Sequence, residues 1–229
     1  MKQTWSELLF LHWPVAEAEL RRLIPARLEV DTFEGRAWVG LVPFTVSGAR
    51  VSFLPPLPLA SSFHEVNVRT YVRHQGADPG VWFFSLDAAH RLVVKIARQL
   101  YKLPYHHARI EMDVSEDGGR HQVAFVSRRV PAERPDVDVR YAPADVPRPA
   151  AAGTLEHFLA ERYVLYSKSA EGLYRARVHH VPYPLQPATV DHVRETRIAS
   201  HGITRPDAEP LAHYAARVDV DIWPLEDVD

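Results

Sequence analysis

The alternation of apolar and polar positions predicts a chain built mainly of β-strands. Residues 63–72 alternate most regularly, and one face of this segment is largely β-branched. The other face carries Phe63, Glu65, Asn67, Arg69 and Tyr71. Residues 81–86 are apolar on both faces, as is typical of a central strand that is covered from both sides. Further strands are expected at 8–13, 28–32, 36–46, 109–114, 120–128, 163–167, 173–181 and 215–223.

Helical spacing of apolar residues indicates about three helices. Pro14 suits the first position of a helix that Pro25 ends, because a proline there costs no hydrogen bond. A second helix is predicted at 89–102, and a third runs from Thr154, a capping residue, to about residue 162. Many strands with few helices predict one α+β domain over residues 1–229. Its curled antiparallel sheet is expected to form a cone-like or barrel-like structure.

The segment 131–153 is rich in proline and alanine and predicts an extended surface loop, with a short strand at 137–141.

Composition excludes several classes of function. The formal net charge of −2 provides no field that favours nucleic acid or an anionic membrane, so neither is expected as a partner. Cysteine is absent, which excludes disulfides, thiolate nucleophiles and cysteine-ligated metals. The first residues carry an acid before any apolar run and lack a small-residue cleavage pattern, so no signal peptide is expected. We therefore expect a soluble cytoplasmic protein.

The polar face of 63–72 leaves two interpretations open. In an open sheet it would face solvent, as the polar side of antiparallel sheets usually does. In a closed sheet it would line an interior cavity. Arg69 would then hold a carboxylate, and Glu65 would be its counter-ion or a proton carrier.

The two histidine pairs are weaker candidates. Adjacent residues of a strand face opposite sides, so only one member of His106–His107, and one of His179–His180, can reach a given pocket. The chain has no His-Glu-x-x-His motif, no phosphate-binding loop and no dinucleotide glycine fingerprint. We predict neither a metal nor a cofactor.

Several motifs in a fixed order resemble a known family. They are Leu11-His-Trp-Pro-Val15, Trp38-Val-Gly-Leu-Val-Pro-Phe44, Phe63-His-Glu-Val-Asn-Val-Arg-Thr-Tyr-Val72, Gly80-Val-Trp-Phe-Phe-Ser-Leu-Asp87, Leu103-Pro-Tyr105, Phe158-Leu-Ala-Glu-Arg-Tyr163 and Val178-His-His-Val-Pro182. The chain resembles the bacterial YqjF-like family, which has no assigned function and belongs to the acetoacetate decarboxylase-like superfamily. The resemblance implies a β-rich domain that encloses a small-molecule cavity. The decarboxylases form oligomers, so a homo-oligomer is one expectation, although no segment indicates an interface.

The same resemblance argues against decarboxylase chemistry. In the decarboxylases a Gly-Phe-Pro-Lys-Lys segment supplies the Schiff-base lysine and its lysine neighbour. The nearest counterpart here is Lys102-Leu-Pro-Tyr-His106, so Tyr105 stands in place of the nucleophile and His106 in place of its neighbour. A phenol cannot form an imine with a ketone. Lys95 and Lys102 could in principle substitute, but a helix face and a helix end favour solvent.

We therefore predict a pocket for a small organic acid or carbonyl compound. Arg69 would bind the anion, Glu65 and His106 would carry protons, and Tyr105 would donate a hydrogen bond to a carbonyl or enolate oxygen. The other ligand-binding candidates are Asn67, Tyr71 and His180. If the protein is an enzyme, hydration, isomerisation or hydrolysis fits these groups.

Two alternatives stay open. One is a non-catalytic ligand-binding or sensing module. The other is a structural protein in which Glu65, Asn67 and Arg69 only fix the fold. The structural alternative requires that no cavity lies between these side chains.

Overall fold

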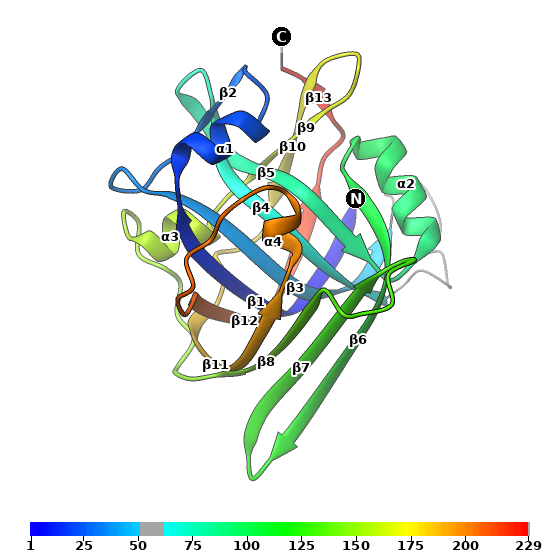
Figure 1. Cartoon of the computed structure of the whole chain (residues 1–229), viewed down its shortest axis with the longest axis vertical. Helices are drawn as coiled ribbons and strands as arrows, with labels where there is room; N and C mark the ends of the chain where they lie inside the picture. The colour runs from blue at the N-terminus through cyan, green and yellow to red at the C-terminus, as the bar shows by residue number, and fades with distance from the viewer. Residues whose placement is uncertain (51–61, 229) are drawn as a thin grey trace.

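The computed structural model describes residues 1–50 and 62–228. This part of the chain forms thirteen strands and four helices (Figure 1). The helices are α1 (Glu17–Leu23), α2 (Arg91–Tyr101), α3 (Leu155–Ala160) and α4 (Arg197–Ser200). The strands are β1 (Lys2–Val15), β2 (Leu28–Val30), β3 (Ala37–Arg50), β4 (Ser62–His74), β5 (Ala77–Ala88), β6 (Tyr105–Asp117), β7 (Arg120–Arg129), β8 (Val137–Pro143), β9 (Val164–Lys168), β10 (Leu173–His179), β11 (Leu185–Glu195), β12 (Leu211–Ile222) and β13 (Glu226–Asp227).

All thirteen strands belong to one strongly curled sheet, which confirms the predicted fold class. The sheet closes as hydrogen-bonded rings rather than as a regular barrel. Following the pairings β5–β4–β3–β1–β12–β10–β9 and back to β5 gives a first ring. A second ring leaves β5 through β6, β7, β8 and β11 and rejoins the first at β12. Strands β5, β4, β3, β1 and β12 are therefore shared by both rings.

The sheet is mixed, which corrects the expectation of a purely antiparallel one. Strand β5 runs parallel to β6, where Leu86 faces Tyr105, and parallel to β9, where Val81 faces Leu165. Both contacts are only two or three residue pairs long. These short parallel contacts bring the start of β6, with Tyr105, beside the end of β5.

Of the strands shared by the two rings, β1, β3 and β4 are buried on both faces over much of their length. In β4, Val66 and Val68 pack into the hydrophobic core of the second ring, around the fully buried Phe125 and Tyr141. The alternate residues of β4 face the inside of the first ring. This is why β1 and β3 show long apolar runs in the sequence although they belong to a largely antiparallel sheet.

Two local predictions were wrong, and further elements were missed. Pro14 lies in β1, paired with Trp38, and α1 begins only at Glu17. Strand β11 and the single turn α4 were not expected. Residues 82–84, expected in the covered core, are half-buried. By contrast, the short strand expected at 137–141 is present as β8, and α2 and α3 lie where helical spacing indicated.

The hairpin of β6 and β7 extends beyond the rings, and α2 lies against the edge of the first ring near the N-terminus (Figure 1). The inner face of α2 is apolar, and its residues Val93, Ala97 and Tyr101 face the interior of that ring. The helix therefore covers part of the ring with hydrocarbon.

Candidate functional site

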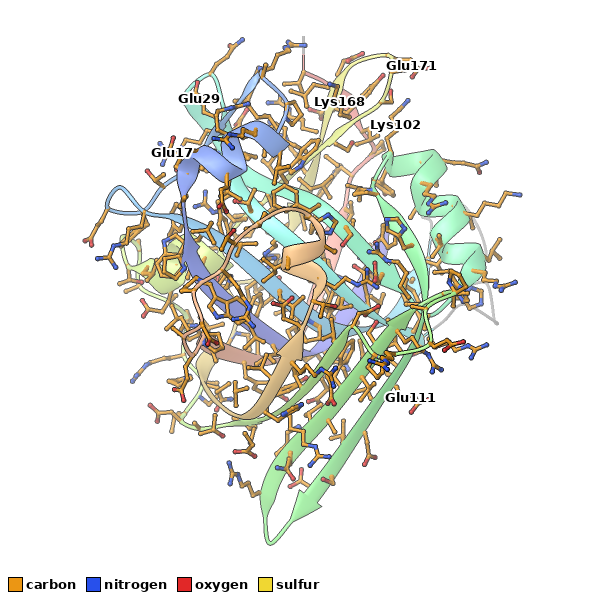
Figure 2. All side chains as sticks on the ribbon, viewed as in Figure 1. Glu17, Glu29, Lys102, Glu111, Lys168 and Glu171 are labelled. Carbon is orange, nitrogen blue, oxygen red and sulfur yellow. The ribbon has the colours of Figure 1, made fainter. Side chains whose placement is uncertain are left out.

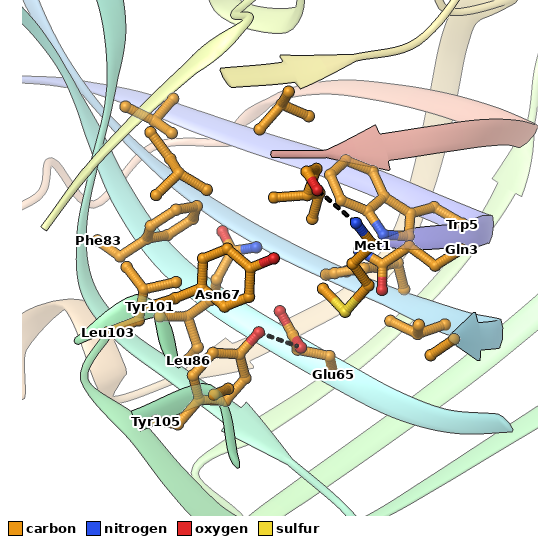
Figure 3. A pocket seen from close by; sticks show the side chains of 18 of the residues that line it. Met1, Gln3, Trp5, Glu65, Asn67, Phe83, Leu86, Tyr101, Leu103 and Tyr105 are labelled. Carbon is orange, nitrogen blue, oxygen red and sulfur yellow. Dashed lines mark hydrogen bonds between the residues drawn. The ribbon is translucent and has the colours of Figure 1, made fainter. Parts of the chain in front are cut away.

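The first ring encloses a cavity of about 740 Å³ (Figure 3). Its wall is mostly aromatic and aliphatic, with contributions from Phe10, Phe44, Phe83, Leu86 and Tyr183. Exposed residues among its lining, Lys2 and Trp223, mark the side that opens to solvent. The purely structural interpretation stated from the sequence requires that no such void lies beside the polar side chains of β4.

Strand β4 supplies a row of polar side chains to this wall. Glu65, Asn67 and Arg69 all line the cavity, because residues two apart on a strand share a face. Each of the three is less than one-tenth exposed. The alternation of 63–72 thus runs in the predicted register, with the polar face inward.

Glu65 and Tyr105 form a hydrogen-bonded pair in the cavity. The Tyr105 hydroxyl donates to Oε2 of Glu65 at 3.0 Å, as Figure 3 shows. Burial raises the pKa of Glu65 from 4.5 to about 8; the bond from Tyr105 opposes this shift and the charge of Asp87 adds to it. Burial and the neighbouring Glu65 raise the pKa of Tyr105 well above its ordinary value. At neutral pH both groups are therefore protonated, and Oε1 of Glu65 is left for a ligand.

Arg69 is a buried cation without a carboxylate partner among the residues that the structure describes. Its Nη2 donates to the carbonyl oxygen of Leu159 at 3.1 Å, and its Nε has no hydrogen-bond partner. The guanidinium lies 5.5 Å from the ring centre of Phe10 and 5.8 Å from that of Tyr71. Aromatic faces stabilise the charge only in part. A buried guanidinium that no described carboxylate neutralises is suited to a carboxylate from outside the chain.

Two further polar atoms of the cavity lining lack partners. Oδ1 of Asn67 and Nε1 of Trp5 are both buried and make no hydrogen bond. Buried polar atoms are nearly always paired in folded proteins, with protein or with ordered water. Nε of Arg69, Oδ1 of Asn67 and Nε1 of Trp5 are thus polar atoms without partners in three residues that line the cavity.

Three predicted site residues do not line the cavity. The hydroxyl of Tyr71 donates to the carbonyl oxygen of Leu159 at 2.8 Å and lies 2.6 Å from Nε2 of His12. His180 packs against the rings of Tyr163 and Tyr183, and its Nδ1 lies 2.8 Å from the carbonyl oxygen of Val181.

His106 follows Tyr105 on β6 and therefore points to the other face of the sheet. It lies there near the ion pair of Asp87 and Arg129. Burial and the charge of Arg129 lower its pKa. The expectation that His106 shares the pocket with Glu65 is therefore wrong, and the cause is the strand alternation itself.

The lysines considered from the sequence also lie away from the cavity. Nζ of Lys102 forms an ion pair with Glu171 at 2.6 Å, and Figure 2 shows this pair with Lys168 at one end of the molecule. Lys95 is on the exposed face of α2. Sequence reasoning missed Lys2, which lies at the mouth of the cavity with Nζ 3.0 Å from Oδ1 of Asp221. Its side chain is 58% exposed, so it remains in contact with solvent.

Sequence reasoning also missed the aromatic part of the wall. Trp5, Phe83 and Tyr183 come from three distant segments, and no local pattern connects them. The only sequence pattern that could have indicated this apolar wall was the apolar stripe of the helix 89–102, whose inner face covers the cavity.

Over residues 1–50 and 62–228, no group of three or more histidine and acidic side chains is arranged to hold a metal ion. None of the helices in this part of the chain is long and apolar enough to cross a membrane.

Comparison with known proteins places the chain in a family. The model of the DUF2071 family, described as an uncharacterized conserved protein, matches residues 2–219. The chain belongs to this family. The uncharacterized protein YqjF of Bacillus subtilis (strain 168) is 41% identical over 225 residues, which cover 98% of this DUF2071 chain and 91% of YqjF. The resemblance stated from the sequence motifs is thereby confirmed.

Solved structures share the fold of this DUF2071 member at low identity. The enduracididine biosynthesis enzyme MppR with bound HEPES buffer matches with a TM-score of 0.70 and 11% identity, over 100% of this chain and 87% of MppR. MppR complexed with pyruvate gives a TM-score of 0.65 at 13% identity, over 100% and 91%. An acetoacetate decarboxylase-like enzyme from Sphingomonas wittichii RW1 gives 0.66 at 14% identity, over 100% and 92%. These likenesses show an acetoacetate decarboxylase-like fold.

Proposed function

We propose that this protein binds a small-molecule carboxylate or carbonyl compound in the cavity of the first ring. The observation that carries the proposal is Arg69, a buried cation in the cavity wall with no carboxylate partner in the described chain. Burying an unpaired charge is costly, so the fold keeps it at a net gain only if a partner arrives. A ligand carboxylate is such a partner. The structural neighbour MppR, complexed with the keto acid pyruvate, supports the same class of ligand.

Non-covalent acid–base chemistry is the reaction type that the site favours. A protonated Glu65 beside the phenol of Tyr105 can polarise a carbonyl oxygen by hydrogen bonding, give it a proton and take one back. Hydration, isomerisation or hydrolysis would use such a pair. An imine mechanism has no desolvated lysine to use among the described residues, because Lys2 lies at the mouth and is exposed.

A binding or sensing module without catalysis is the second candidate. It is favoured by the position of His106, which removes one of the two expected proton carriers from the cavity. Exchange of ligand protons separates the two candidates. With 4-oxopentanoate in D₂O, an enzyme would accelerate exchange next to the carbonyl, and Glu65→Gln would abolish the acceleration. Binding without any acceleration would favour the module.

The anion site is tested by calorimetry with pyruvate, 4-oxopentanoate and 7-oxooctanoate. We expect at least one of these acids to bind, and Arg69→Gln to weaken it at least tenfold, since a charge-assisted bond contributes about 1.5–3 kcal/mol. Arg69→Lys serves as the control because it keeps the positive charge, and it should lose less. Unchanged binding in Arg69→Gln, or no binding of any probe, would overturn the proposal.

Borohydride reduction in the presence of the same acids tests the chemistry. We expect no covalent adduct by mass spectrometry. A stoichiometric adduct on Lys2 would show that the exposed amine at the mouth acts as a Schiff-base nucleophile, contrary to the proposal.

A further inference from the structure

The cavity is much larger than a short keto acid requires. Its volume of about 740 Å³ lies in the range that encloses a drug-sized ligand, roughly 300–1,000 Å³. Pyruvate has six non-hydrogen atoms and would leave most of this apolar wall facing water. Because the cost of unfilled apolar surface grows with its area, the wall favours an occupant with a substantial apolar body.

The two polar ends of the cavity are far apart. Glu65 and Arg69 are four residues apart on β4, which corresponds to about 13 Å along the strand at roughly 3.3 Å per residue. Their side chains also bind in opposite directions. Arg69 bonds to Leu159 and stacks on Tyr71, at one end, whereas Glu65 accepts from Tyr105, at the other. One small molecule with adjacent carboxylate and ketone groups cannot engage both.

The space between these ends is mainly apolar. Asn67 stands midway along β4, paired with Val42 of β3 and Leu86 of β5, while Phe44 and Phe83 are paired with Glu65 and Arg69 at the two ends. Figure 3 shows Asn67 between the Glu65–Tyr105 pair and Phe83. An extended hydrocarbon segment would contact these residues.

We infer that the ligand is a bifunctional amphipathic acid: its carboxylate binds Arg69, an apolar body fills the middle, and a carbonyl or hydroxyl group meets Glu65 and Tyr105. Allowing a hydrogen bond of about 2.8 Å at each end, its polar groups are roughly 7 Å or more apart. In 2-keto acids the two groups are on neighbouring carbons. This inference rests on the proposed function and narrows its ligand class.

Calorimetry with a matched series tests the inference. The series is pyruvate, 4-oxopentanoate, 7-oxooctanoate, octanoate without the carbonyl, and 2-octanone without the carboxylate. We expect 7-oxooctanoate to bind at least 30-fold more tightly than pyruvate, because each buried methylene contributes up to about fourfold in affinity. Octanoate should bind several-fold more weakly than 7-oxooctanoate, since one hydrogen bond is lost.

A substitution at either end of the cavity should weaken only those ligands that carry the functional group bound at that end. Tyr105→Phe should weaken the binding of 7-oxooctanoate several-fold and leave the affinity for octanoate unchanged. Arg69→Gln should weaken the binding of both acids and leave the affinity for 2-octanone unchanged. The carbonyl stretch of bound 7-oxooctanoate should shift to lower frequency in the wild type and shift less in Tyr105→Phe.

Two results would overturn the inference and are distinguishable from failure of the proposed function. If pyruvate binds in an Arg69-dependent way and the longer acids bind no better, the carboxylate site stands and the long ligand is wrong. If octanoate and 7-oxooctanoate bind equally in the wild type and in Tyr105→Phe, the second polar contact is wrong. Absence of Arg69-dependent binding by every acid would overturn both proposals.

Discussion

At the scale of single residues, the position of Glu65 couples the stability of the fold to pH. Its pKa is about 8 in the folded chain against 4.5 as a free side chain, so the folded state holds the proton more strongly. Between these two values the folded chain binds more protons than the unfolded chain, and the free energy of unfolding falls as pH rises. The contribution is fully present below about pH 4.5 and is lost by about pH 8.

We therefore predict that Glu65→Gln will flatten this dependence. Gln cannot ionise. The melting temperature of the variant minus that of the wild type should therefore be higher at pH 9 than at pH 5. The shift is of order several degrees, because one pKa unit corresponds to 1.36 kcal/mol. Thermal unfolding at both pH values measures it. Glu29→Gln, at an exposed position on β2, is the control, and its melting temperature should change with pH as that of the wild type does. Parallel pH profiles for wild type and Glu65→Gln would contradict the buried, protonated carboxyl.

Tyr105 has a separate, measurable effect on its neighbour. Its hydroxyl bond lowers the pKa of Glu65 relative to burial alone, because it stabilises the carboxylate. We predict that Tyr105→Phe raises the pKa of Glu65 further. Isotope-edited infrared spectroscopy of the carboxyl band during a pH titration would show the midpoint move upward. A downward shift would mean that water enters to replace the phenol.

At the scale of elements, the strand 63–72 was predicted in its correct register, and its polar face turned out to point inward. Period-2 alternation identifies which residues share a face, and this holds in any sheet. It does not say whether that face meets water or a cavity. That outcome depends on the pairings β4–β5 and β5–β9, which join segments too far apart in sequence for a local pattern to reveal.

The wrong local predictions have physical causes. Pro14 is compatible with the start of a helix and equally with a strand where its missing N–H is not needed, so proline alone could not decide. Strand β11 has an exposed face and little apolar alternation, and it is held by β8 and β12 rather than by its own pattern. His106 was placed in the pocket by analogy, whereas strand geometry allows only one of Tyr105 and His106 there.

Closure of the first ring depends on a glycine in β5. A Cβ atom at Gly80 would lie 2.6 Å from the carbonyl oxygen of Val164 and 2.8 Å from the ring of Tyr166, both in β9. We predict that Gly80→Ala destabilises the protein by about 1–3 kcal/mol, the usual cost of overpacking. Gly172→Ala is the matched control, because its Cβ would meet nothing nearer than 3.5 Å. Urea unfolding of the two variants measures the difference, and equal midpoints would contradict the tight β5–β9 contact.

At the scale of the whole molecule, the two rings share strands and differ in content. The second ring is filled by hydrocarbon around fully buried side chains such as Phe125 and Tyr141, whereas the first encloses the cavity. Side chains of both rings pack into large hydrophobic clusters, but only those of the first ring also border the cavity. Shared strands join the cavity wall that carries Arg69 to the filled ring.

This division predicts unequal costs for the same substitution in the two rings. Phe125→Ala removes a fully buried ring from a packed core and should cost about 3–5 kcal/mol. Phe83→Ala removes a half-buried ring whose one side already faces the cavity, so it should cost about 2 kcal/mol or less. Urea unfolding measures both, with unchanged m-values as the control that the unfolded states are comparable.

Phe83 also faces the proposed ligand body, so Phe83→Ala should bind 7-oxooctanoate more weakly. Phe125→Ala, where folded, should bind it normally. Equal losses of stability would mean that the first ring is as densely packed as the second.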